Sequence, residues 1–307
     1  MKLVTFTQNG SAPKPGLVRD GKIVDLSPFA KDMVELIENF DRIKSKIESA
    51  LATIPESSVT LLSPIPRPVS MRDGYAFRQH VESARKGRGL PMIPEFDLFP
   101  VFYFTNALAV VGPGNLPVQK QALQDLDFEL EVAIVIGKKG KNIPASKADQ
   151  HIFGYMVMND WSARALQREE MKLNLGPAKG KDFATGLGPY LVTRDELSKY
   201  VVPSPHGDRL NLRMRAWLND QQVSDGNVQT MNWTFGQIIE RASYGVTLLP
   251  GEVIGSGTVG TGCFMELNAT KTTNNLWIKP GDTFVCEIEA LGRLENKIVE
   301  APETYED

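Results

Sequence analysis

Short apolar stretches separated by glycine and proline make up the first 30 residues. KLVTF and PGLVRDGKIVDL follow this pattern, and Asp20-Gly21 in the second stretch is typical of a tight hairpin turn. The pattern predicts a small β meander. From residue 31 to about 52, apolar residues recur at helical spacing, which predicts a helix packed on the meander. These residues are Val34, Ile37, Phe40, Ile43 and Ile47.

The stretch SPIPRPVS at 63–70 interrupts any regular element, since it is rich in proline and serine. It predicts a boundary between a small N-terminal α/β domain, residues 1–64, and a larger domain, residues 65–307. In the larger domain we expect helices at 76–86, 145–151, 162–171 and 234–243, and a strand at 128–137 that enters the interior. Most of the rest consists of short strand-like segments. The sequence therefore indicates a β-rich α+β fold.

Length, charge and cysteine content exclude several kinds of protein. The 307 residues are 42% hydrophobic, which suffices for a large domain with a small companion. The net charge is -3 and no block of like charges stands out, so nucleic acid is not an expected partner. The N-terminus lacks a signal-peptide or membrane-spanning pattern, and we expect a soluble, cytoplasmic protein without a membrane partner. Cys263 and Cys286 are too few for a disulfide framework and are expected to be buried thiols.

Three carboxylates alternate along the predicted strand at 128–137 and the residue before it. Asp127, Glu129 and Glu131 should share one face of a strand, because side chains alternate between its faces. The residues AIVIG that follow are apolar, so the strand enters the core, where unpaired carboxylates are costly. A solvated strand end or an arginine partner would satisfy them. A Mg²⁺ site is the other interpretation, because oxygen ligands suit hard divalent cations.

Two further polar features have ordinary structural interpretations when each is taken alone. Asp160 and Ser162 follow the apolar stretch IFGYMVM, and an acid or serine between a strand and a helix is commonly a helix N-cap. Asp73 and His80 lie at opposite ends of a short polar segment, and His80 is one of only three histidines. A single histidine is more often structural than catalytic.

Taken in order, these segments resemble the fumarylacetoacetate hydrolase family from about residue 64 to 290. The matching blocks are RDGYAFRQH, LDFELEVA, HIFGYMVMNDWSARALQ, GPAKGKDFATGLGP and SGTVGTGCFMELN. The resemblance implies a mixed β-sandwich or roll as the catalytic domain. It also implies a homodimer.

The resemblance assigns a role to each residue of a site. As metal ligands or neighbours of the metal it implies Asp73, Glu129, Glu131, Asp160, Lys181 and Thr185. As catalytic residues it implies the base His80 with its partner Glu266, and Lys181 and Gln167 for developing negative charge. As substrate contacts it implies Tyr75, Tyr103, Thr258 and one of Arg85 and Arg88. The implied metal is Mg²⁺, with Ca²⁺ and Mn²⁺ as alternatives.

The implied activity is metal-dependent hydrolysis of a carbon–carbon bond in a 1,3-diketo acid, such as fumarylacetoacetate or an acylpyruvate. Met171 replaces a tyrosine of the family, which leaves the substrate open. Two alternatives remain. One is a family decarboxylase or isomerase acting on oxaloacetate or on a diacid of aromatic catabolism, and the other is a catalytically silent small-acid binding protein.

Residues 255–260, GSGTVG, also fit the glycine pattern of dinucleotide-binding loops. That pattern requires a following helix, whose N-terminus receives the pyrophosphate. The next residues, CFMELNATK, alternate like a strand. We therefore expect no nucleotide cofactor.

Overall fold

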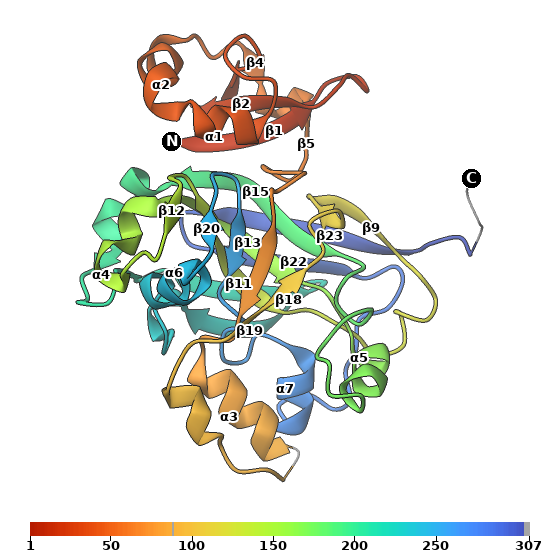
Figure 1. The fold of residues 1–307 in the computed structure, drawn as a ribbon. Coiled ribbons are helices and arrows are strands. Elements are labelled where there is room, and N and C mark those ends of the chain that lie inside the picture. Colours follow the sequence, from red (N-terminus) through yellow and green to blue (C-terminus); the bar gives the residue numbers. More distant parts are fainter. Residues whose placement is uncertain (88, 304–307) are drawn as a thin grey trace.

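The computed structural model describes residues 1–87 and 89–303. The N-terminal part forms a group of short elements at one end of the molecule (Figure 1). The hairpin at Asp20-Gly21 is confirmed, and both residues have positive φ angles. The single predicted helix is divided in two at Asn39, whose backbone N–H caps the first. The elements are β1 (Lys2–Thr7), β2 (Lys14–Arg19), β3 (Lys22–Asp25), α1 (Met33–Glu38), α2 (Phe40–Ser49), β4 (Ile54–Pro55), a 3₁₀ turn (Glu56–Ser58) and β5 (Thr60–Leu61).

One large mixed sheet runs from the N-terminal part into the rest of the molecule. Its order is β4-β3-β2-β1-β15-β13-β11-β21-β6-β7, and β5 and β8 pair beside this path. The added strands are β6 (Met71–Gly74), β7 (Phe102–Thr105), β8 (Val110–Val111), β11 (Leu130–Ile136), β13 (Ile152–Asp160), β15 (Thr185–Thr193) and β21 (Val253–Gly255). Helices α1 and α2 share a buried cluster with Ala133 and Met156 of this sheet. A domain boundary at residue 64 therefore stays a prediction.

A second sheet packs on the first and completes a sandwich. Its order is β19-β18-β22-β23-β9. Its strands are β9 (Gly114–Val118), β18 (Arg213–Leu218), β19 (Gln221–Asn227), β22 (Thr283–Ile288) and β23 (Gly292–Glu300). Val132 and Val157 of the first sheet and Phe284 of the second belong to one buried cluster. The predicted β-rich α+β sandwich is thus confirmed.

Short strand pairs and helices surround the two sheets. The pairs are β10 (Leu126–Asp127) with β14 (Ser162–Ala163), β12 (Gly140–Lys141) with β20 (Thr247–Leu248), and β16 (Val201–Val202) with β17 (Arg209–Leu210). The helices are α3 (Arg78–Gly87), α4 (Ala145–Ala148), α5 (Arg164–Met171), α6 (Phe235–Ser243) and α7 (Phe264–Ala269). Further 3₁₀ turns are Pro94–Asp97, Asp149–His151, Arg194–Tyr200 and Val228–Thr230. Helices α3 and α7 pack against each other beneath the large sheet (Figure 1). Within the described residues, every helix falls short of the apolar length that a bilayer crossing requires.

The predicted strand after the glycine-rich segment 255–260 is wrong, because that segment leads into helix α7. Cys263 is the N-cap of this helix, and its Sγ accepts the N–H of Glu266. A nucleotide therefore cannot be excluded on the ground that a strand follows the glycine-rich segment, because a helix follows it. The N–H groups of Phe264 and Met265 donate to Asp127 at 2.7 and 3.0 Å, so a carboxylate of the chain occupies this helix N-terminus. The absence of a nucleotide cofactor stays a prediction.

Candidate metal centre and proton-transfer site

Four carboxylates from neighbouring segments of the large sheet meet at one point. Asp73 lies in β6, Glu131 in β11 and Asp160 at the end of β13, while Glu129 directly precedes β11. All four side chains are buried, and one oxygen of each lies within 4.8 Å of the others. We call Asp73, Glu129, Glu131 and Asp160 the carboxylate cluster.

Gly255 makes room for this cluster. It pairs with Ala133 of β11 on one side and with Asp73 of β6 on the other. A Cβ atom at this position would lie 2.5 Å from Asp73 Oδ1 and 2.9 Å from Glu131 Oε2. Two residues later, the N–H of Gly257 donates to the same two oxygens, at 3.2 and 2.9 Å. Gly255 at the end of β21 therefore leaves space for the cluster, and Gly257 in the following turn hydrogen-bonds to it.

Gly255→Ala is expected to weaken divalent-metal binding by about tenfold or more, because overpacking of this kind costs about 1–3 kcal/mol. The added methyl group would force Asp73 and Glu131 away from each other. Titration calorimetry with Mn²⁺ would measure the change in affinity, and circular dichroism would check the fold. Unchanged affinity in the folded variant would contradict this role of the glycine.

Lys181 provides a buried positive charge at the cluster. Its Nζ donates to Glu129 Oε2 and to Asp160 Oδ2, at 2.6 Å each. Burial alone would lower the pKa of Lys181, but Asp160 and Glu129 hold this pKa above its ordinary value. A protonated ammonium group has no lone pair for a metal. In this arrangement Lys181 is therefore a charge partner of the carboxylates and does not act as a ligand.

Arg164, which the sequence did not single out, is a second buried cation. It donates to Asp127 Oδ2 at 2.8 Å, to Glu129 Oε1 at 2.7 Å and to Gln167 Oε1 at 2.9 Å. The predicted arginine partner thus exists for Asp127 and Glu129. Although burial raises the pKa of Glu129, Lys181 and Arg164 together lower it. Arg164 and Gln167 lie three residues apart on a helix, and this spacing is the sequence signal that could have indicated the contact between these two residues.

The carboxylate cluster fits a divalent cation. Glu131 Oε1 and Asp160 Oδ1 are buried and lack a hydrogen-bond partner within the described chain. Burial and the neighbouring Asp73 raise the pKa of Glu131 far above its ordinary value. Burial and the charge of Asp160 also raise the pKa of Asp73, to about 7. The donor set consists only of oxygens, which hard cations prefer, and a bound cation would relieve this repulsion.

Metal binding should stabilise the protein more at high pH than at low pH. The pKa of Asp73 is about 7 in the folded protein and 3.8 ordinarily, so the metal-free fold loses stability as pH rises from about 4 to about 7. A cation bound at the carboxylate cluster replaces the proton that Asp73 retains, so metal binding removes this loss of stability. We expect saturating Mn²⁺ to raise Tm more at about pH 8 than at about pH 6. Differential scanning fluorimetry would measure both gains, and equal gains would contradict the linkage.

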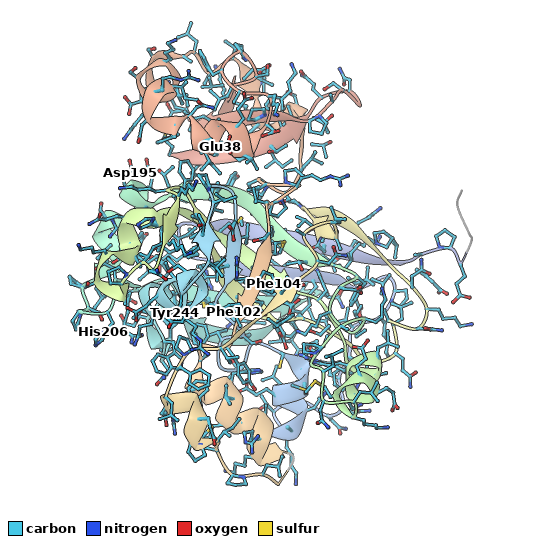
Figure 2. All side chains as sticks on the ribbon, in the orientation of Figure 1. Glu38, Phe102, Phe104, Asp195, His206 and Tyr244 are labelled. Carbon is cyan, nitrogen blue, oxygen red and sulfur yellow. The ribbon has the colours of Figure 1, made fainter. Side chains whose placement is uncertain are left out.

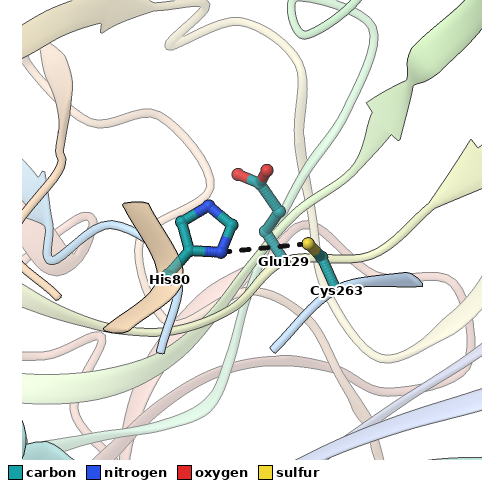
Figure 3. A group of neighbouring side chains, drawn as sticks. All are labelled: His80, Glu129 and Cys263. Carbon is teal, nitrogen blue, oxygen red and sulfur yellow. Dashed lines mark hydrogen bonds between the residues drawn. The ribbon is translucent and has the colours of Figure 1, made fainter. Parts of the chain in front are cut away.

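His80 and Glu266 form a buried pair beside the cluster. Helix α3 carries His80, helix α7 carries Glu266, and His80 Nδ1 lies 2.9 Å from Glu266 Oε2. An ionised carboxylate only accepts, so Nδ1 carries a hydrogen, and Nε2 has a lone pair when the ring is neutral. A ring nitrogen of His80 lies within 4.8 Å of a Glu129 oxygen. Figure 3 shows the nitrogen opposite Nδ1 on the side of the Glu129 carboxylate.

Other predicted residues line the same region. Thr185 is buried and pairs with Asp160 across β15 and β13, so both side chains share a face. The Tyr103 hydroxyl donates to Asp160 Oδ2 at 2.6 Å. The ring of Tyr75 packs edge-on against His80 at 5.9 Å. Thr258 is buried and follows Gly257 in the turn.

One interpretation of the sequence does not match the structure, while the role of Arg85 or Arg88 as a substrate contact stays a prediction. The N-cap of α5 is Ala163, so an N-cap role for Asp160 or Ser162 is wrong. The Arg85 guanidinium donates to the carbonyl of Pro91, a bond within the segment after α3. Arg88 lies outside the described residues.

Comparison with known proteins identifies the family of this chain. The family model for the C-terminal part of fumarylacetoacetate hydrolase matches residues 70–299. A mitochondrial oxaloacetate tautomerase of Bos taurus is 34% identical over 314 residues, which cover 97% of this chain and 92% of the relative. Fumarylacetoacetase of Bos taurus is 31% identical, across 64% of this chain and 58% of its own length.

Solved structures show the same fold. Fumarylacetoacetate hydrolase from Exiguobacterium antarcticum is 26% identical with a TM-score of 0.76, and the match covers 98% of this chain and 100% of that one. Maleylpyruvate hydrolase from Sphingobium sp. SYK-6, solved with Mn²⁺ and pyruvate, is 22% identical with a TM-score of 0.73 over the same shares. The resemblance drawn from the sequence blocks is confirmed, and this chain belongs to the fumarylacetoacetate hydrolase family.

Proposed function

We propose that this protein is a divalent-metal-dependent enzyme that interconverts the enol and keto forms of a small 2-oxo diacid, with oxaloacetate as the first candidate. The observation that carries the proposal is the buried His80–Glu266 pair directly beside the carboxylate cluster. This arrangement combines a proton-transfer group with a cation site. The oxaloacetate tautomerase of Bos taurus, matched over 97% of this chain, supports the choice of substrate.

Carbon–carbon bond hydrolysis of a 1,3-diketo acid, the activity first implied by the sequence, becomes the second candidate. The match to fumarylacetoacetase favours it, although that match covers only 64% of this chain. The same histidine could take a proton from water instead of from substrate. The two reactions therefore differ in what His80 acts on.

Asp73, Glu129, Glu131 and Asp160 would hold the metal. We propose Mg²⁺, and the Mn²⁺ in the maleylpyruvate hydrolase structure keeps that ion as an alternative beside Ca²⁺. When bound, the metal supplies positive charge that polarises the 2-oxo group of the substrate. Because the Tyr103 hydroxyl donates to Asp160, we propose that Tyr103 orients this metal ligand and does not contact the substrate.

His80 would move the proton. In the enol-to-keto direction the enol hydroxyl loses one proton and carbon 3 gains one, so nothing else enters or leaves. Nε2 can accept and donate that proton, because Nδ1 is held by Glu266. Glu266 also stabilises the imidazolium that forms between the two transfers.

Lys181 and Gln167 would act on the oxygen where negative charge develops. Lys181 is buried, charged and within 2.6 Å of two cluster carboxylates. Gln167 turns its carbonyl oxygen to Arg164, which leaves its NH₂ group as a donor. Donors of this kind typically contribute about 3–4 kcal/mol each. Tyr75 and Thr258 remain proposed substrate contacts.

The test is a pair of assays on the metal-loaded protein. The enol form of oxaloacetate absorbs ultraviolet light, and we expect its decay to accelerate with Mg²⁺ or Mn²⁺ and to return to the buffer rate with a chelator. In parallel, fumarylacetoacetate and acylpyruvates are tested for release of acetoacetate or pyruvate. Release from the diketo acids without enol decay would favour the hydrolase. Ligand binding without turnover of any substrate would favour the silent binding protein.

We also propose that the protein is a homodimer. Strand β7 is an edge of the large sheet, and Phe104 on this strand is 64% exposed (Figure 2). Leu98 and Val101 just before the strand are exposed as well. An exposed apolar edge of this kind is suited to association. Light scattering coupled to gel filtration should give twice the chain mass, and a monomer would overturn the proposal.

A further inference from the structure

We propose that His80, Glu129 and Cys263 form a second metal site, which takes Zn²⁺ and blocks the base when occupied. Their side chains are all buried, and one nitrogen, oxygen or sulfur atom of each lies within 4.8 Å of the others. Cys263 Sγ lies 4.0 Å from His80 Nδ1 (Figure 3). We call these three residues the thiolate site.

The donor atoms distinguish the thiolate site from the carboxylate cluster. Nitrogen, sulfur and oxygen together suit the borderline-soft Zn²⁺, whereas the all-oxygen cluster suits harder cations. In a tetrahedral zinc site, Zn–S of about 2.3 Å and Zn–N of about 2.0 Å place sulfur and nitrogen about 3.5 Å apart. The observed 4.0 Å therefore needs only a small closure.

The surrounding charge favours another cation. Lys181 and Arg164 both contact Glu129, and their positive charges would repel a metal ion bound near that residue. Against these two cations stand six buried carboxylates: Asp73, Asp127, Glu129, Glu131, Asp160 and Glu266. With the carboxylates ionised, the region stays negative even with a divalent ion in the carboxylate cluster. Burial raises the pKa of the Cys263 thiol, which is therefore protonated before the metal arrives.

Zinc at this site would remove the base. The thiol proton is released to solvent as the Zn–S bond forms, because a coordinated thiol is deprotonated. Zinc takes Nδ1, so the ring hydrogen moves from Nδ1 to Nε2 and Glu266 loses its partner there. Nε2 then has no lone pair with which to accept a proton from substrate or water. This inhibition rests on the proposed function, whereas zinc binding itself does not.

The chain supplies a matched control. Cys263 also caps α7, where its Sγ accepts the N–H of Glu266 at 3.4 Å. Serine is a good N-cap but a poor zinc ligand, so Cys263→Ser separates the two roles. Cys286, the other cysteine, is buried in β22 of the second sheet and serves as the control Cys286→Ser.

The experiment uses the full chain loaded with Mn²⁺ and a Cd²⁺ titration followed by thiolate-to-metal absorbance in the ultraviolet. We expect the absorbance in wild type and in Cys286→Ser, and its loss in Cys263→Ser. For an active enzyme, Zn²⁺ should inhibit wild type at least about tenfold more strongly than Cys263→Ser, each relative to its own uninhibited rate. Because the absorbance needs no turnover, it decides on the site even if the proposed function fails.

Three results would overturn the proposal. They are no thiolate absorbance in wild type, absorbance that survives Cys263→Ser, and equal zinc inhibition of wild type and Cys263→Ser. The last would place zinc in the carboxylate cluster. If Cys263→Ser does not fold, His80→Ala keeps the thiol and should lower Cd²⁺ affinity by about tenfold or more. Unchanged affinity in that variant would equally reject the site.

Discussion

Glu131→Gln is expected to lower divalent-metal affinity by at least about tenfold and to remove most activity at limiting metal. The substitution removes one negative charge and almost no volume. Glu131 Oε1 and Asp160 Oδ1 both lack a hydrogen-bond partner among the described residues, but Asp160 also contacts the Lys181 cation, whereas Glu131 forms no ion pair with a described residue. Excess Mg²⁺ or Mn²⁺ should restore part of the activity. Titration calorimetry and the enol assay would measure the two effects.

The stability of the metal-free variant separates loss of a ligand from loss of the fold. Burial and the neighbouring Asp73 raise the pKa of Glu131, so its charged form is disfavoured without metal, and glutamine should leave the metal-free Tm unchanged or higher. The gain in Tm on adding metal should shrink. Glu38→Gln, on the exposed surface of α1, is the control (Figure 2). Wild-type metal affinity in Glu131→Gln would reject the metal centre.

The alternation of Asp127, Glu129 and Glu131 predicted one shared strand face, but the structure brings only Glu129 and Glu131 together, because the strand breaks after Asp127. β10 ends at Asp127 and β11 begins at Leu130, so the alternation does not run through residues 128 and 129. Asp127 consequently turns to Arg164 and the start of α7, while Glu129 and Glu131 reach the cluster. Spacing along a strand fixes which residues share a face only while the strand continues.

The buried cations could not be assigned from local sequence. Arg164 contacts a carboxylate 35 residues earlier, and Lys181 contacts one 52 residues earlier. Such distances carry no periodic signal, because they depend on how strands are ordered in the sheet. The block order of the family indicated Lys181. Arg164 was missed, because no single-residue argument distinguishes it from a surface arginine.

Helix α7 shows a second limit of predicting secondary structure from the local sequence. In the nine residues CFMELNATK, both strand alternation and helical spacing fit the apolar positions. Phe264 and Leu267, three residues apart, are both buried, and the helix packs against α3. Tertiary contact therefore decided between two local patterns. The outcome matters for function, because α7 carries Glu266 toward His80.

A continuous buried network connects the proposed metal ligands with the His80–Glu266 pair. Glu129 binds Arg164, Arg164 binds Asp127, and Asp127 accepts the first N–H groups of α7. Glu266 is on that helix and holds His80. The position of the base is thus set by α7 and Asp127, without a direct bond from His80 to a cation ligand. Removing the imidazole should therefore leave the ligands in place.

His80→Ala is accordingly expected to abolish turnover while the binding of Mn²⁺ at the carboxylate cluster and the binding of substrate remain largely intact. A general base typically contributes a factor of about 10²–10⁴, so kcat should fall by at least the lower figure. Glu266→Gln should give a milder loss, because the imidazole keeps a hydrogen-bond partner and loses only the charge that stabilises its protonated form. His206→Ala is the matched control, since His206 is exposed (Figure 2).

The same variants also decide which reaction the site performs. If tautomerisation is the activity, His80→Ala should slow enol decay while the dissociation constants for Mn²⁺ and substrate change little. If the protein is a hydrolase, the enol rate should be at the buffer level in wild type, and His80→Ala should stop product release from the diketo acid.

Near-normal kcat in His80→Ala for every substrate would show that His80 does not transfer the proton. Lys181 is protonated and bound to two carboxylates, so it could not easily replace His80 as a base. The reaction would then have to use a group other than the His80–Glu266 pair.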